Sequence, residues 1–117
     1  MKVLVLDDLK SRINEMNAAL EKGKHKVTAC STSNEFINAV EDQSIGCICL
    51  DYETWHKGRA IYGYFNIQKR IERMPIVVYN SPTHYSAIAN RTKHDKDRML
   101  AKPTESFSLV EAVAQCV

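Results

Sequence analysis

The chain has 117 residues, of which 44% are hydrophobic and 26% are charged, and its formal net charge is +2. These values are typical of one globular domain spanning residues 1–117, and the sequence shows no internal repeat, linker or low-complexity segment. No apolar run is long enough to cross a membrane, and no signal peptide precedes the first apolar run, so the sequence predicts a cytoplasmic protein with no membrane partner.

Cysteine usage and charge distribution argue against two further classes of function. The cysteines Cys30, Cys47, Cys49 and Cys116 form no Cys-x-x-Cys pair, so we predict buried thiols rather than a metal or redox centre. Residues 52–117 carry ten Lys and Arg against six Asp and Glu. No base-reading helix or aromatic platform accompanies this charge, so direct nucleic-acid binding is not predicted.

In the first half of the chain, three short apolar runs alternate with two segments of helical spacing. The predicted strands are Lys2–Leu6, a run within His25–Cys30, and Ile45–Asp51. Helices are predicted from Ile13, Met16, Asn17 and Leu20, ending near Gly23, and from Phe36, Ile37 and Val40, with capping hydroxyls at Ser31, Thr32 and Ser33. Because Ile45–Asp51 is apolar on both faces, we predict a central strand covered by helices on both sides.

The second half continues the alternation. Tyr52–Gly58 is predicted to be a loop, and a longer helix follows with Ala60, Tyr64, Ile67, Ile71 and Met74 on its apolar face, ended by Pro75. The remaining elements are a strand at Ile76–Tyr79, a weak helix over roughly Thr83–Thr92, a strand at Met99–Ala101, and a helix that buries Leu109, Val110 and Val113. Five strands alternating with five helices predict an α/β fold, a doubly wound five-stranded parallel sheet with right-handed crossovers.

Polar side chains follow the predicted strands where they end. Asp7 and Asp8 follow the first strand, Asp51 ends the third, Asn80 follows the fourth and Lys102 follows the fifth. Because the carboxyl ends of parallel strands meet at one edge of a sheet, we expect these side chains to lie together. Three carboxylates in one place repel unless a cation joins them, and hard oxygen ligands suit Mg²⁺ rather than zinc. A carboxylate beside Mg²⁺ and a lysine also suits phosphoryl transfer onto aspartate.

With these residues in place, the chain resembles receiver domains of two-component response regulators, of the chemotaxis-regulator type, over essentially its whole length. The resemblance is carried by Val5-Leu6-Asp7-Asp8, Leu50-Asp51, Pro75-Ile76-Val77-Val78 and Ala101-Lys102-Pro103, with Leu109 leading into the last helix. It implies a flavodoxin-like sheet with strand order 2-1-3-4-5.

The resemblance also implies roles for individual residues. Asp51 would accept a phosphoryl group from a histidine kinase or a phosphotransfer protein, and Lys102 would contact the phosphoryl oxygens. Asp7, Asp8 and Asp51, with the backbone carbonyl of Glu53, would hold Mg²⁺. The protein would not turn over an external substrate, since it would only catalyse its own phosphorylation and dephosphorylation. A downstream effector domain or protein would read the switch, and a homodimer is an open alternative.

Several positions depart from the family pattern. Asn80 stands where the family has Thr or Ser, and Ser81 would take that place if the register moved by one residue. Met99 replaces the aromatic switch residue, for which Tyr79 is a candidate substitute. Trp55 follows the phosphoacceptor, and two interpretations are open: an exposed lid or partner anchor, or a side chain packed on its own helix.

Three functions therefore remain to be separated. The leading hypothesis is a phosphorylation switch. The second is a phosphorylation-independent (pseudo-receiver) interaction module, in which Asn80, Met99 and Trp55 serve a constitutive interface; the intact carboxylates and Lys102 argue against it. The third is a hydrolase with an aspartyl nucleophile and Glu53 as general acid, which the sequence disfavours because no cap domain is present to hold a substrate.

Overall fold

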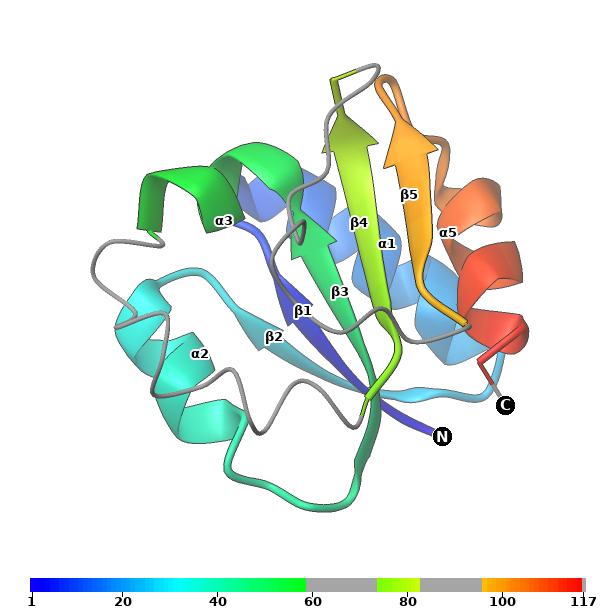
Figure 1. Cartoon of the computed structure of the whole chain (residues 1–117). Coiled ribbons are helices and arrows are strands. Elements are labelled where there is room, and N and C mark those ends of the chain that lie inside the picture. The colour runs from blue at the N-terminus through cyan, green and yellow to red at the C-terminus, as the bar shows by residue number, and fades with distance from the viewer. Residues whose placement is uncertain (59–73, 83–95, 117) are drawn as a thin grey trace.

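The computed structural model shows a parallel sheet with helices on both faces (Figure 1). The structure describes residues 1–58, 74–82 and 96–116. Its five strands are β1 (Lys2–Leu6), β2 (Lys26–Cys30), β3 (Ile45–Asp51), β4 (Ile76–Ser81) and β5 (Arg98–Ala101). All neighbours pair in parallel, in the order β2-β1-β3-β4-β5. The predicted fold class and strand order are confirmed.

The described ranges contain the helices α1 (Lys10–Lys22), α2 (Ser33–Ala39), α3 (Tyr52–Gly58) and α5 (Ser106–Ala114). The helices predicted around Ala60–Met74 and Thr83–Thr92 lie almost wholly outside the described residues. None of the helices in the described ranges has the length and apolar character that crossing a lipid bilayer requires.

Alternation along β3 divides the core into two layers. Ile48 and Leu50 pack into the layer under α2 and α3, whereas Cys47 and Cys49 pack into the layer under α1 and α5. Successive side chains of a strand point to opposite faces, so a strand covered on both sides must be apolar throughout. This explains why the run predicted to be the central strand is buried on both faces.

The four cysteines are free and buried, as predicted. Three of them lie in the layer under α1 and α5, where the sulfur atoms of Cys47 and Cys116 are 3.6 Å apart. Burial raises the pKa of Cys30 to about 11. A thiol with this pKa is almost fully protonated at neutral pH and is a poor nucleophile or metal ligand.

Local sequence explains where α1 and α2 begin and end. Thr32 caps α2 by accepting the backbone N–H of Glu35, while the Glu35 carboxylate accepts the N–H of Ser31. The contact from Thr32 satisfies one of the backbone donors that a helix start leaves unpaired. At the end of α1, Gly23 is the C-cap as predicted, but the left-handed residue is Lys24, with a φ of 67°.

The prediction of a loop at Tyr52–Gly58 is wrong, because these residues form α3. The Asp51 carboxylate accepts the backbone N–H of Thr54 at 3.1 Å, which is the geometry of an N-cap. Trp55 is consequently carried into the core: it is 1% exposed and its ring meets Phe36 edge-on at a centroid distance of 6.0 Å. The interpretation of Trp55 as an exposed lid or partner anchor is therefore wrong.

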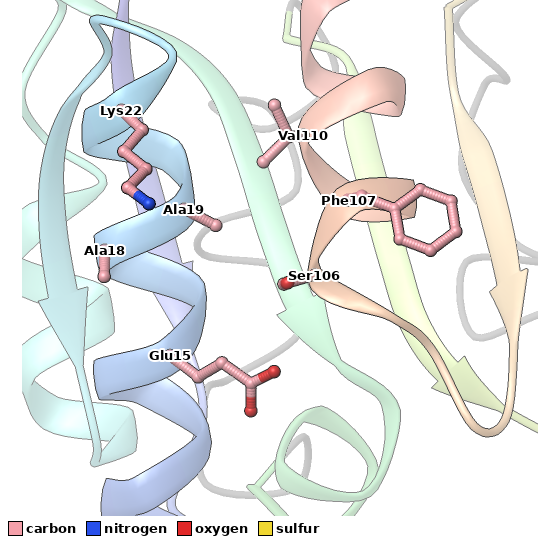
Figure 2. Close-up of a pocket in the computed structure, with 7 residues that line it drawn as sticks. All are labelled: Glu15, Ala18, Ala19, Lys22, Ser106, Phe107 and Val110. Carbon is pink, nitrogen blue, oxygen red and sulfur yellow. The ribbon is translucent and has the colours of Figure 1, made fainter.

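Helices α1 and α5 pack on the same face of the sheet, with a groove of about 450 Å³ between them. Figure 2 shows residues of α1 on one side of this groove and residues of α5 on the other. Phe107 of α5 lines it, yet 68% of its surface is exposed. It is the most exposed of the large hydrophobic residues that the structure describes, so it carries little of the stability of the core.

Trp55→Ala is expected to destabilise the protein by about 3–5 kcal/mol, since it removes a buried ring and leaves a cavity against Phe36. Urea unfolding measures this change. Phe107→Ala is the matched control and is expected to change the free energy of unfolding by less than about 0.5 kcal/mol. Equal losses in the two variants would contradict the burial of Trp55.

Candidate functional site

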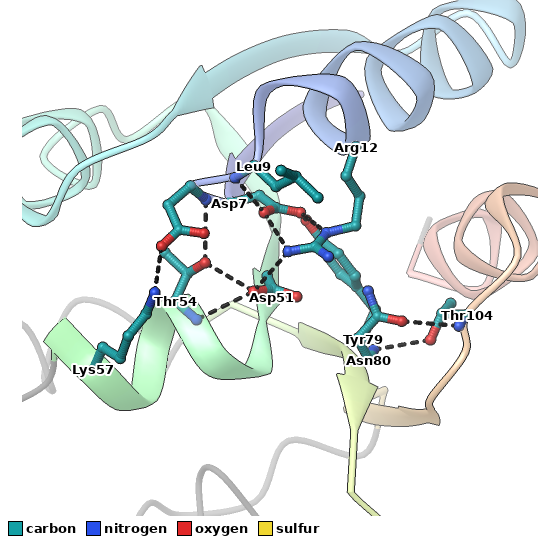
Figure 3. A network of polar contacts seen from close by, with 10 residues as sticks. Asp7, Leu9, Arg12, Asp51, Thr54, Lys57, Tyr79, Asn80 and Thr104 are labelled. Carbon is teal, nitrogen blue, oxygen red and sulfur yellow. Dashed lines mark hydrogen bonds and ion pairs between the residues drawn. The ribbon is translucent and has the colours of Figure 1, made fainter.

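The register of the strands brings the acidic residues together at one edge of the sheet. Leu6 of β1 pairs with Leu50 of β3, so the residues that follow them, Asp7 and Asp51, stand at the same level. Carboxylate oxygens of Asp7, Asp8 and Asp51 all lie within 4.8 Å of one another. Figure 3 shows the polar contacts around this cluster.

Asp7 is fully buried and its carboxylate accepts four hydrogen bonds. Oδ1 receives the backbone N–H of Leu9 at 3.0 Å and an Arg12 N–H at 2.8 Å. Oδ2 receives the Arg12 Nε–H at 2.6 Å and the Tyr79 hydroxyl at 2.7 Å. A buried carboxylate is tolerated when it is paired and fully hydrogen-bonded, and Asp7 meets both conditions.

Arg12 is one of the site residues that sequence reasoning missed, with Thr54 and Thr104. Its guanidinium forms a fork on Asp7, and its terminal nitrogen also lies 3.1 Å from Oδ2 of Asp51 (Figure 3). The hydrogen bonds to Asp7 raise the pKa of Arg12 further above its usual value, so the group stays charged. A signal was present in the sequence: Arg12 stands in the first turn of a helix, where the helix dipole disfavours a cation.

Asp51 is 2% exposed, and Thr54 donates two hydrogen bonds to its carboxylate. The Thr54 hydroxyl donates to Oδ2 of Asp51 at 2.8 Å and also accepts the backbone N–H of Asp8 at 3.1 Å. Burial raises the pKa of Asp51, and the charge of Asp7 raises it further, while Thr54 and Arg12 lower it. Asp51 is thus a buried carboxylate held among charged and hydrogen-bonding groups.

Asp8 lies at the rim of the cluster and is exposed. Its carboxylate pairs with Nζ of Lys57 on α3 at 2.6 Å, which holds the pKa of Asp8 below its usual value. An exposed ion pair of this kind contributes little to stability.

A cavity of about 280 Å³ opens beside Asp51. Of the residues singled out from the sequence, Asp51, Glu53, Asn80 and Lys102 line it. The remaining lining residues are Arg12, Glu15, Met16, Pro103 and Thr104. The structure therefore brings the ends of β3, β4 and β5 to one small polar space, with Arg12 between that space and Asp7.

Asn80 is held by the loop after β5. Its side-chain oxygen accepts the backbone N–H of Thr104 at 2.9 Å, and its own backbone N–H donates to the Thr104 hydroxyl at 2.9 Å (Figure 3). Its φ of 53° is left-handed, a region that asparagine tolerates far better than branched residues do. Ser81 is buried and its hydroxyl donates to the carbonyl of Pro82, and it is not among the described residues that line the cavity.

The two candidate switch residues lie in opposite environments. Tyr79 is fully buried, and its hydroxyl reaches Asp7, so it belongs to the interior of the site and not to an interface. Burial raises the pKa of Tyr79 well above its usual value, which keeps the hydroxyl a donor. Met99, by contrast, is 38% exposed on β5.

The acidic cluster fits a hard divalent cation by residue type, since Asp7, Asp8 and Asp51 offer closely spaced carboxylate oxygens. The carboxylates are therefore of the type that suits Mg²⁺. Arg12 already forms ion pairs with two of these carboxylates, those of Asp7 and Asp51, so its guanidinium is bonded to oxygens of the same carboxylates.

Comparison with solved structures identifies the fold. No protein-family model and no curated protein sequence matches the chain. NtrX from Brucella abortus, solved in complex with ADP, matches with a TM-score of 0.74 and 22% identity over 98% of this chain and 25% of NtrX. The non-phosphorylated HemR receiver domain from Leptospira biflexa matches with a TM-score of 0.74 and 12% identity, covering 98% of this chain and 92% of that domain.

A third match is the chemotaxis response regulator CheY4 of Vibrio cholerae, with a TM-score of 0.69 and 18% identity over 99% of this chain and 98% of CheY4. Many further matches are receiver domains as well. The chain therefore has the fold of response-regulator receiver domains, as the resemblance implied.

Asp51→Asn is expected to be more stable than the wild type at pH 7, with an advantage that disappears as the pH falls towards about 4. A carboxyl whose folded pKa lies above its ordinary value of 3.8 costs stability above the folded pKa, and the cost vanishes below the unfolded pKa. Urea unfolding between pH 4 and pH 8 measures the difference.

Asp42→Asn is the contrasting control. Lys2 and Ser44 hold the pKa of Asp42 below its usual value, so Asp42 adds stability at neutral pH and loses it as the pH falls.

A lower stability of Asp51→Asn than wild type at pH 7 would contradict the prediction for Asp51. It would mean that the stabilisation of the Asp51 carboxylate by Arg12 outweighs the cost of its burial.

Asn80→Thr, which introduces the residue type that the sequence resemblance predicts at this position, is expected to destabilise the protein, because a branched side chain at a φ of 53° costs about 1–3 kcal/mol. Asn80→Gly is the matched control: it loses the same hydrogen bond to Thr104 but adopts a left-handed conformation without strain. Equal losses in urea unfolding would show that the backbone conformation does not matter.

Proposed function

We propose that this protein is a phosphorylation switch of the receiver type, in which Asp51 accepts a phosphoryl group from a histidine kinase or a phosphotransfer protein. The observation that carries the proposal is the setting of Asp51. In a receiver fold, it is a buried carboxylate at the end of β3, beside a cavity that Asn80 and Lys102 also line. A carboxylate oxygen would attack phosphorus, the donor's P–N bond would break, and an aspartyl phosphate would form.

The residues of this chain have distinct roles in the proposed reaction. Lys102 would pair with phosphoryl oxygens, and the raised pKa of Arg12 keeps a second positive charge beside Asp51. Asp7, Asp8 and Asp51, with the backbone carbonyl of Glu53, would hold Mg²⁺. The metal would neutralise charge on the equatorial oxygens of the transferred group. Thr54 holds the Asp51 carboxylate in place through two hydrogen bonds.

The output would follow from the change of charge at Asp51. A phosphoryl group adds negative charge and acceptor oxygens next to Arg12 and at the start of α3. A shift in these contacts would alter the affinity for a downstream effector domain or protein. In this proposal the protein works in the cytoplasm and catalyses only its own phosphorylation and dephosphorylation.

A second candidate is a phosphorylation-independent interaction module. Two observations favour it: Arg12 is already paired with the carboxylates of Asp7 and Asp51, and the Asn80 oxygen is already bonded to Thr104. A site balanced in this way is stable without phosphate chemistry. The two candidates differ in whether Asp51 gains a phosphoryl group.

Incubation with acetyl phosphate and Mg²⁺ is expected to add one phosphoryl group, measured by intact mass, and to change the fluorescence of Trp55. This residue is buried on the helix that Asp51 caps. Asp51→Asn should gain nothing, and Asp42→Asn, which alters a carboxylate outside the cluster, should behave as wild type. Failure of the wild type to gain mass with either acetyl phosphate or a phosphorylated phosphotransfer protein would favour the interaction module.

A further inference from the structure

Arg12 occupies carboxylate oxygens that a divalent cation would need. Its Nε and terminal N–H groups bond both oxygens of Asp7, at 2.6 and 2.8 Å, and the terminal nitrogen also reaches Oδ2 of Asp51 at 3.1 Å. The remaining donors to these oxygens, from Leu9, Thr54 and Tyr79, are neutral. Among the described residues, the positive charge bonded directly to Asp7 and Asp51 comes from Arg12 alone.

The position of Arg12 is not explained by the helix that carries it. Helix α1 begins at Lys10, only two residues after Asp8, and its first turn contains Lys10 and Arg12 but no acidic residue. The dipole of a helix disfavours cations at this end. The compensating interaction is with the two buried carboxylates, and the short connection after β1 places Arg12 within their reach.

Arg12 is also the member of the cluster that has room to move. Its side chain is 26% exposed, whereas those of Asp7 and Asp51 are 0% and 2% exposed. It lines the 280 Å³ cavity beside Asp51, so its guanidinium can leave the carboxylates without crossing the core. The two aspartates are fixed by the ends of β1 and β3 and have no comparable freedom.

We propose that Arg12 is a resident counter-ion that competes with divalent metal for Asp7 and Asp51, so that metal binds only when the guanidinium leaves these oxygens. Arg12 then sets the metal affinity of the site and, through it, readiness for phosphorylation. This inference rests on the proposed function only in taking these aspartates as metal ligands. When only a minor state of a protein can bind a metal, the apparent affinity for that metal is lowered in proportion to the population of the state.

Calorimetric titration of Mg²⁺ into wild type, Arg12→Gln and Lys10→Gln tests the competition. Arg12→Gln is expected to bind Mg²⁺ about tenfold more tightly or better, if the competent state of the wild type is a tenth of the population or less. Lys10→Gln removes the same charge from an exposed position in the same turn. It is expected to change the affinity by less than about twofold, which reports the long-range effect of charge alone.

An Arg12→Gln variant that is folded by circular dichroism and binds Mg²⁺ no more tightly than wild type would overturn the proposal. A second measurement needs no variant: the Nε–H resonance of Arg12 in the NMR spectrum of the wild-type protein is expected to shift on saturation with Mg²⁺. A resonance unchanged by bound Mg²⁺ would equally overturn it, since the guanidinium would then have stayed on Asp7.

The outcomes separate this inference from the proposed function. Tighter metal binding by Arg12→Gln, with no phosphoryl gain in any variant, would support the competition and reject the switch. Phosphoryl gain by the wild type, with unchanged metal affinity in Arg12→Gln, would support the switch and reject the competition.

Discussion

The burial of two like charges at one edge of the sheet is the constraint on which the rest of the site depends. Asp7 and Asp51 follow paired residues of adjacent parallel strands, so the register of β1 and β3 places them together. Two buried carboxylates cannot both stay ionised without compensating charge and hydrogen bonds. Arg12, Tyr79 and Thr54 supply this compensation from α1, β4 and α3. The cluster therefore ties together elements on both faces of the sheet.

Asp51 connects the chemistry of the site to the hydrophobic core. Its carboxylate ends β3 and also caps α3 through the N–H and hydroxyl of Thr54. The next residue of α3, Trp55, packs against Phe36 of α2 in the core layer under α2 and α3. A change in the charge of Asp51 acts directly on the first turn of α3. It is thereby coupled to one of the largest buried side chains in the described structure.

The backbone arrangement could be predicted from the sequence because it depends on simple patterns. Apolar runs alternating with segments of helical spacing predicted the strands and their parallel direction, and the aspartates at the ends of the first and third runs predicted the gathering of Asp7, Asp8 and Asp51. The contacts of side chains could not be predicted in the same way. The reach of Arg12 depends on the residue at which α1 begins, and the burial of Trp55 depends on a helix that begins directly after β3.

The conformation of Asn80 shows the same limit. Alignment with the family pattern identifies the position at the end of β4, but only the backbone reveals that its φ is 53°. Asparagine is therefore suited to its own backbone as well as to the cavity, and its side-chain oxygen fixes the loop at Thr104. An interpretation of Asn80 as only an altered phosphate ligand misses this structural role. The role comes from a backbone conformation that a hydrophobicity pattern does not reveal.

Fixed and movable parts of the site come from different elements. The carboxylates of Asp7 and Asp51 are held by paired strands and are almost fully buried. The guanidinium that pairs with both of them belongs to Arg12, which lies in the first turn of α1 and borders a cavity. Exchanging one cation for another therefore requires a side chain to rotate and leaves the sheet unchanged. Because the ends of β1 and β3 keep their positions, a switch built on this exchange would be transmitted through α1 and α3, the two helices whose first turns bind the carboxylates.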